Sequence, residues 1–168
     1  MKILLKKLLL PAIVLALLGF LFLQLNNKPL APNVTFTTIE GNQISMASLK
    51  GKVVLVNFWA TDCPGCIKEM PQLIETYNQY NKKGFEIIAV AMPYDPPAQV
   101  LNYTKMKALP FPVMHDGLAE ITNQFGKVAL TPTAFIYDKQ GRLVRRTIGE
   151  LDFSALTLLL NKELAGKG

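Results

Sequence analysis

The sequence has few side chains that bind transition metals, because its 168 residues include only two cysteines and one histidine. Cys63, Cys66 and His115 together give one ligand fewer than a structural zinc site needs. A dense stripe of lysine and arginine is also absent, as is any interleaving of basic with aromatic residues, which argues against binding to nucleic acid. No cofactor motif, internal repeat or low-complexity segment occurs. We expect one globular domain with a terminal extension, no bound metal ion and no cofactor.

Charged residues are missing from residues 8–25, an apolar run near the N-terminus. The run is longer than the roughly 7–15 residues of a signal-peptide core and at the short end of the roughly 17–25 that cross a membrane. No convincing small-residue cleavage site follows it, and no cysteine near it could carry a lipid. We predict a transmembrane anchor at 8–25 that is not cleaved, with a cleaved signal peptide as the alternative.

The predicted orientation follows from three lysines at the N-terminus. Lys2, Lys6 and Lys7 place residues 1–7 in the cytoplasm, because positive residues remain on that side of a membrane. A tether at 26–33 then leads to a domain at 34–168 on the periplasmic or extracytoplasmic side. Without those three lysines, 15 of the 18 basic side chains remain against 12 acidic ones, so the domain is only mildly basic.

The two cysteines lie in Cys63-Pro64-Gly65-Cys66, shortly after the apolar run 53–60. That run has the length and the β-branched content of a buried strand, and Pro64 suits the first turn of a helix. Cys63 is therefore expected at a helix N-terminus, where free N–H groups and the helix dipole stabilise a thiolate. Cys66 follows one turn later on the same side, close enough for a disulfide. Such a pair can cycle between dithiol and disulfide, and its loop is too short to stabilise the fold much.

Hydrophobic periodicity predicts strands and helices in alternation along the domain. The helix after Cys63 is expected to run through Tyr80 with a kink at Pro71, and Asp152 is expected to cap the last helix. This alternation predicts an α/β domain with helices on both faces of a sheet. Strands are expected at 34–39, 43–46, 53–58, 85–91, 111–114, 133–138 and 142–148, and further helices at 97–107, 118–125 and 153–164.

Several segments carry a resemblance to a known family. The predicted strand, the motif Trp59-Ala60-Thr61-Asp62-Cys63-Pro64-Gly65-Cys66 and the kinked helix resemble the thioredoxin fold. The lead-in 49–60 and Glu69-Met70-Pro71 are similar to TlpA/ResA-type membrane-anchored thiol-disulfide oxidoreductases, and Thr131-Pro132-Thr133 resembles their cis-proline segment. The resemblance covers about 34–164. It implies a thioredoxin-like α/β fold with a central mixed sheet flanked by helices, an N-terminal β-hairpin, an insertion at 92–115 and one preceding transmembrane helix.

The resemblance implies a redox cycle at the cysteine pair. Cys63 is expected to attack a sulfur of a client disulfide, and Cys66 then attacks Cys63 and releases the reduced client. The chain leaves this cycle oxidised, so a membrane thiol reductant of the CcdA or DsbD kind is implied as its electron donor. The expected clients are proteins that bear disulfides or thiols, such as apocytochrome c or the copper-site cysteines of an oxidase.

A client-binding surface beside the pair is also implied by the resemblance. Pro132 is expected to be cis and to pack against the cysteines, and the backbone of Thr131 is expected to bind an extended client strand. Pro64, Gly65 and Trp59 complete the expected substrate-binding residues, and ordinary core packing is the alternative for Trp59.

Two carboxylates near the pair are candidates for tuning its chemistry. Asp62 directly precedes Cys63 and should oppose thiolate formation, unless it points away into solvent. Glu86 lies among apolar residues at the start of a predicted strand, and if buried it could take the proton of Cys66 that Asn57 cannot exchange. A solvent-exposed glutamate at a strand end is the alternative for Glu86.

These features predict an extracytoplasmic disulfide reductase, because Pro64-Gly65 lacks the histidine that helps make DsbA-like proteins strong oxidants. Net oxidation of secreted proteins is the alternative direction of electron flow. A non-catalytic copper carrier is the alternative outside enzymes, with Met114, His115 and the two cysteines as ligands, although Sco-like proteins have a wider cysteine spacing.

Overall fold

A mixed five-stranded sheet lies at the centre of the computed structural model, which describes Leu15, Leu17, Gly19 and residues 28–166. Its strands are β3 (Val53–Trp59), β4 (Phe85–Ala91), β5 (Val113–His115), β6 (Thr133–Tyr137) and β7 (Leu143–Ile148). They lie in the order β5-β4-β3-β6-β7. β3 pairs in parallel with β4 and antiparallel with β6, so the sheet is mixed as predicted.

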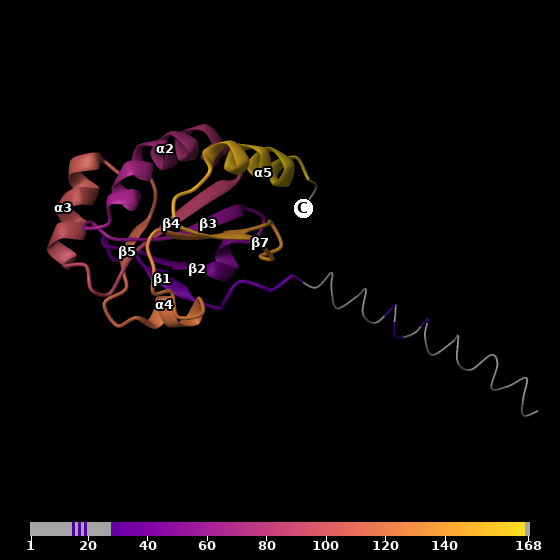
Figure 1. Ribbon diagram of the computed structural model, residues 1–168, viewed down its shortest axis with the longest axis horizontal. Helices are drawn as coiled ribbons and strands as arrows, with labels where there is room; N and C mark the ends of the chain where they lie inside the picture. Colours follow the sequence, from indigo (N-terminus) through magenta and orange to yellow (C-terminus); the bar gives the residue numbers. More distant parts are fainter. Residues whose placement is uncertain (1–14, 16, 18, 20–27, 167–168) are drawn as a thin grey trace, which may run out of the picture.

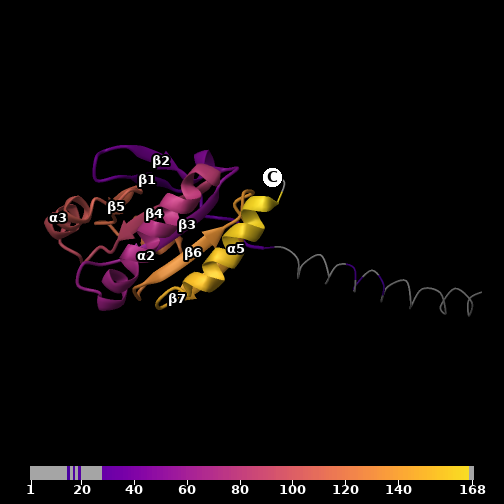
Figure 2. The same cartoon turned by 90° about the horizontal axis from the view of Figure 1, so that it is seen from above.

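Helices and a small hairpin surround the sheet. They are β1 (Thr35–Thr37), β2 (Gln43–Ser45), α2 (Pro64–Tyr80), α3 (Pro97–Lys107), α4 (Glu120–Gln124) and α5 (Phe153–Ala165), with short 3-10 turns at η1 (Met46–Leu49) and η2 (Asn81–Lys83). α2 and α5 cover one face of the sheet, and α4 lies on the opposite face with β1 and β2 (Figure 1). α3 lies beyond β5 at one end of the domain (Figure 2).

Every residue of β3 and β4 is buried, because both faces of these strands are covered. Leu55 belongs to the core beneath α2 and α5, together with Leu73 and Leu156. Phe58 belongs to the core on the other face, where its ring meets that of Phe125 edge to face at 5.2 Å. The central strand is thereby held from both sides, and the loop that follows it starts from a rigid point.

Most predicted elements are confirmed, with shifts at their ends. β4 and α3 begin and end where predicted. β5 starts at Val113 and not at residue 111, because Pro112 has no N–H for the ladder. α4 starts later than residue 118, because the left-handed Ala119 (φ 57°) precedes its first turn. Asp152 caps α5 as predicted, since its side chain accepts a hydrogen bond from the Ala155 N–H at 3.0 Å.

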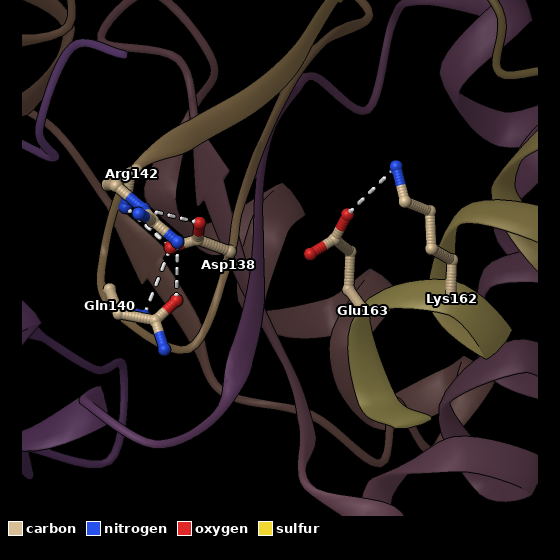
Figure 3. Close-up of polar contacts among 5 residues, drawn as sticks. All are labelled: Asp138, Gln140, Arg142, Lys162 and Glu163. Carbon is tan, nitrogen blue, oxygen red and sulfur yellow. Dashed lines mark hydrogen bonds and ion pairs between the residues drawn. The ribbon is translucent and has the colours of Figure 1, made fainter. Parts of the chain in front are cut away.

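The turn between β6 and β7 is fixed by the buried carboxylate of Asp138 (Figure 3). Its Oδ1 accepts hydrogen bonds from the backbone N–H groups of Gln140 (3.0 Å) and Arg142 (2.9 Å), and its Oδ2 accepts one from Arg142 Nε (2.8 Å). Burial alone would raise the pKa of Asp138, but these donors hold the pKa below its usual value. The carboxylate therefore fixes the conformation of the turn that joins β6 to β7.

The segment 29–31 pairs with the start of β7. Pro29 accepts a hydrogen bond from the Leu143 N–H (2.7 Å), and the Ala31 N–H donates to the Gly141 carbonyl (2.8 Å). Part of the predicted tether is therefore an edge of the folded domain. Within the residues the structure describes, no helix is both long and apolar enough to cross a membrane. The predicted tail at 1–7 and nearly all of the predicted anchor at 8–25 lie outside those residues.

Candidate active site

The cysteine pair lies at the junction between β3 and α2. Cys63 occupies the N-cap of α2 in an extended conformation (φ −95°, ψ 106°), and Pro64 is the first helical residue. The two cysteines form a disulfide with their Cα atoms 5.3 Å apart. The Cys63 Sγ also accepts a hydrogen bond from the Cys66 N–H at 3.2 Å. The helix N-terminus therefore supplies one of its free donors to the Cys63 sulfur, where it would stabilise a thiolate.

The two sulfurs differ in their access to solvent. Cys63 is 9% exposed, whereas Cys66 is completely buried beneath the first turn of α2. Cys63 is therefore the cysteine of the pair that a partner protein can approach. Cys66 is positioned to react with Cys63 itself, which is the geometry of an attacking and a resolving cysteine.

A cis peptide bond joins Thr131 and Pro132 beside the pair, as predicted. Pro132 lies against the motif, because its Cδ is 3.5 Å from the position that a Cβ on Gly65 would occupy. Thr131 is half-buried, and its Oγ1 is 3.4 Å from the hydroxyl of Tyr94. The structure thus places Pro132, and with it Thr131, against the Gly65 side of the cysteine motif.

A buried carboxylate, Glu69, lies on the same face of α2 as Cys66. Residues three apart on a helix have Cβ atoms about 5–6 Å from each other, so Glu69 is a neighbour of Cys66. Its side chain is 2% exposed, and its Oε2 accepts a hydrogen bond from the Leu151 N–H at 3.0 Å. The other oxygen, Oε1, has no hydrogen-bond partner among the described residues.

Burial raises the pKa of Glu69 to about 6. The Leu151 N–H and the amide of Asn57 oppose this rise, and the charge of Glu150 adds to it. The Asn57 contact is too poor in geometry for a hydrogen bond, since neither polar atom of that side chain has a partner in the described part of the chain. Glu69 can therefore exchange a proton near neutral pH at a point one helical turn from Cys66.

The loop that precedes Cys63 is held by the buried Asp95. Its Oδ2 accepts a hydrogen bond from the Thr61 N–H and its Oδ1 accepts one from the Thr61 hydroxyl, both at 2.6 Å. The Asp95 carbonyl lies 2.8 Å from His115 Nε2, which must carry a proton because a carbonyl can only accept. His115 thus helps to hold Asp95, and through it the loop that contains Thr61, in place. In the described ranges, no three histidine, cysteine, aspartate or glutamate side chains are grouped to hold a metal ion.

Comparison with known proteins agrees with this geometry. The Redoxin family matches residues 25–158. The thiol-disulfide oxidoreductase ResA of Bacillus thuringiensis subsp. konkukian (strain 97-27) is 40% identical over 132 residues, which make up 79% of this chain and 75% of that protein. This chain belongs to the Redoxin family. It is a thioredoxin-like thiol-disulfide oxidoreductase of the ResA type, as the resemblance predicted.

Solved structures confirm the thioredoxin-like fold of this Redoxin-family chain. The solution structure of a Neisseria meningitidis protein is similar to it with a TM-score of 0.75 at 38% identity, covering 82% of this chain and 91% of that chain. The crystal structure of a thiol:disulfide interchange protein of the thioredoxin family from Chlorobium tepidum TLS gives a TM-score of 0.73 at 29% identity. It covers 83% of this chain and 98% of that chain.

The structure does not bring Glu86 to the cysteine pair, which corrects the predicted proton transfer. Glu86 pairs in register with Val54, whereas Cys63 follows the opposite end of β3, after Trp59. Five strand residues at about 3.3 Å each separate the two ends by about 16 Å. Glu86 is buried as expected, but its carboxylate accepts from Lys52 Nζ (2.8 Å) and from the Tyr77 hydroxyl (3.0 Å).

Trp59 is completely buried, so the expectation that it contacts the client does not hold for this conformation. Its ring lies 5.3 Å from that of Tyr103, in the core between the sheet and the helices. Trp59 belongs to the same buried cluster as Cys63 and Cys66, so core packing is compatible with a side chain that shields the pair. Asp62 is exposed, also in line with its alternative interpretation.

Glu69 is the candidate site residue that sequence reasoning missed. The motif Glu69-Met70-Pro71 was noted only as a family resemblance. A local signal was nevertheless present, because Glu69 falls in the buried stripe of α2 with Cys66, Met70 and Leu73. Because Glu69 lies three residues after Cys66 in the buried stripe of one helix, its position indicates a candidate proton acceptor more directly than that of Glu86 in another strand.

Proposed function

We propose that this ResA-type oxidoreductase is an extracytoplasmic disulfide reductase that acts through Cys63. The observation that carries the proposal is the unequal exposure of the two cysteines, since Cys63 keeps 9% of its surface exposed and Cys66 none. The reduced enzyme attacks a client disulfide with the Cys63 thiolate, and one client sulfur leaves as a thiolate that takes up a proton. The product is a mixed disulfide between Cys63 and the client.

Glu69 serves the second half of this cycle. In the mixed disulfide Cys66 is a buried thiol, which must lose its proton before it can attack. The Glu69 carboxylate accepts that proton, because burial has raised its pKa to about 6 and its Oε1 has no other partner among the described residues. The Cys66 thiolate then attacks Cys63 Sγ, a disulfide forms within the motif, and the client leaves with two electrons and two protons gained in all.

The motif supports reduction of the client as the direction of net electron flow. Pro64-Gly65 supplies no histidine that could hold Cys63 as a thiolate. A reduced form that is less stabilised than in a strong oxidant lowers the reduction potential, which favours a reductant. We propose a membrane thiol reductant of the CcdA or DsbD kind as the electron donor, and apocytochrome c or oxidase copper-site cysteines as clients.

The reduction potential decides the direction. The full chain is equilibrated with glutathione redox buffers, and the reduced fraction is read from alkylation and mass. A reductase predicts a potential near that of thioredoxin, about −270 mV, whereas a potential near that of DsbA, about −120 mV, would establish the oxidant alternative. Stoichiometric Cu(I) binding without disulfide reduction would favour the copper carrier.

We also propose that residues 8–25 anchor the chain in the cytoplasmic membrane with the domain at 34–168 on the extracytoplasmic side. The uncharged run and the three preceding lysines support this orientation. The untreated full chain should fractionate with the membranes. Protease added to intact spheroplasts should then digest the domain. A domain that is protected from protease, or released by salt washing, would contradict the placement.

A further inference from the structure

The loop 149–151, between β7 and α5, forms a third side of the active site. The Gly149 N–H donates to the Pro132 carbonyl (2.8 Å), and the Leu151 N–H donates to the Glu69 carboxylate (3.0 Å). Gly149 has a φ of 95°, a conformation that favours glycine. The loop is therefore tied to the cis-proline segment at one end and to α2 at the other, and Glu150 lies between these two ties.

The side chain of Glu150 extends over the cysteine motif. Its Cγ is 3.3 Å, and its Oε1 3.5 Å, from the position that a Cβ on Gly65 would occupy, and Pro132 Cδ is 3.5 Å from the same point. Its Oε2 pairs with Lys68 Nζ at 2.7 Å. This pair is open to solvent, since the Glu150 side chain is 47% exposed and that of Lys68 is 73% exposed. The carboxylate is therefore held in place and remains accessible to a partner.

A client must pass this carboxylate to react. Its sulfur has to reach Cys63 Sγ, so the residues next to the client cysteine lie across Gly65, where the side chains of Glu150 and Pro132 meet the motif. Two residues of extended chain span about 7 Å, which keeps the neighbours of the reacting cysteine within reach of Glu150.

We propose that Glu150 selects client sites with a lysine or arginine within about two residues of the reacting cysteine, an extended stretch of about 7 Å. A client cation at this point shares the Glu150 carboxylate with Lys68 or replaces Lys68, whereas a client carboxylate is repelled. Glu150 thereby acts as a specificity-determining residue for the exchange reaction. The inference rests on the proposed attack by Cys63 on a client disulfide.

Two matched disulfide peptides test the proposal. They differ only at the residues beside the cysteine, which are lysine in one and glutamate in the other. Second-order exchange rates with the full-length protein are measured in both directions, so that the result does not depend on the direction of net electron flow. We expect the lysine peptide to react about three to five times faster, as one exposed ion pair allows, and the ratio to fall in about 0.5 M salt.

Three variants separate Glu150 from a general effect of charge. Glu150→Gln should bring the ratio close to one, and Lys68→Gln should increase it, because the carboxylate loses its internal cation. Glu75→Gln removes an exposed carboxylate from α2 further along the helix and should leave the ratio unchanged. Equal rates for both peptides with the wild-type protein, or a ratio that survives Glu150→Gln, would overturn the inference alone. Failure of the wild-type protein to exchange with either peptide would overturn the proposed function as well.

Discussion

Replacing Glu69 with glutamine should stabilise the oxidised protein at neutral pH, because it removes a buried charge. Burial raises the pKa of Glu69 from 4.5 to about 6, and a difference of about 1.5 pH units corresponds to about 2 kcal/mol. The pKa is higher in the folded protein than in the unfolded chain. The cost of ionisation is therefore absent below about pH 4.5, grows between about pH 4.5 and 6, and is complete above that. Glutamine never ionises, and its oxygen can still accept the hydrogen bond from Leu151.

Urea unfolding of the disulfide-intact proteins measures this effect. At about pH 7.5 the free energy of unfolding of Glu69→Gln should exceed that of the wild type by up to about 2 kcal/mol, and at about pH 4 the two should be nearly equal. In single-turnover exchange, the variant should also accumulate the mixed disulfide, because Cys66 loses its proton acceptor. A stability difference that stays the same from pH 4 to 7.5 would refute the assignment of a raised pKa to this carboxylate.

Three further substitutions probe other contacts. Glu86→Gln should lower the free energy of unfolding by about 1 kcal/mol, because Lys52 and Tyr77 lose a charged partner. The pH dependence of exchange should not change, and an altered pH profile would show that Glu86 takes part in the reaction. Asp138→Ala should lower the free energy of unfolding in chemical denaturation by about 2–3 kcal/mol, because it deletes three hydrogen bonds. Exchange rates should stay at the wild-type level, and a slower reaction would show that the turn affects the active site. Gly149→Ala should lower the free energy of unfolding by about 1–2 kcal/mol in thermal unfolding, since a φ of 95° strains any other residue. The exchange reaction should also become slower, and full activity would argue that the loop 149–151 can shift freely.

The sequence predicted the site best where local chemistry and chain order were sufficient. Pro64 and the preceding apolar run placed Cys63 at the start of α2. These signals depend on the fixed φ of proline and on its missing N–H, so they act without regard to tertiary structure. The same is true of the cap at Asp152.

Glu86 and Glu69 show where sequence reasoning failed. Both acids lie among apolar residues, and burial of each was a reasonable expectation. The end of the sheet at which a strand residue lies depends on the pairing register of β3 with β4, which no local pattern revealed. Glu69 needed only the helical spacing from Cys66, and that relation was overlooked.

The loop 149–151 was not predictable in the same way. Its contacts join residues far apart in the chain, since Gly149 bonds to Pro132 and Leu151 bonds to Glu69. Only the folded arrangement of β7 and α5 brings Glu150 over Gly65. A glycine followed by an acid between a strand and a helix is otherwise an ordinary surface turn.

The account depends most directly on the division of labour between the two cysteines. Cys66→Ser and Cys63→Ser are reduced, mixed with one equivalent of a peptide disulfide, and analysed by intact mass. Cys66→Ser should form a stable one-to-one mixed disulfide, because Cys63 attacks and no thiol is left to resolve it. Cys63→Ser should remain unmodified, because the Cys66 sulfur is completely buried. Equal formation of mixed disulfide by both variants, or by Cys63→Ser alone, would contradict the proposed roles of Cys63 and Cys66.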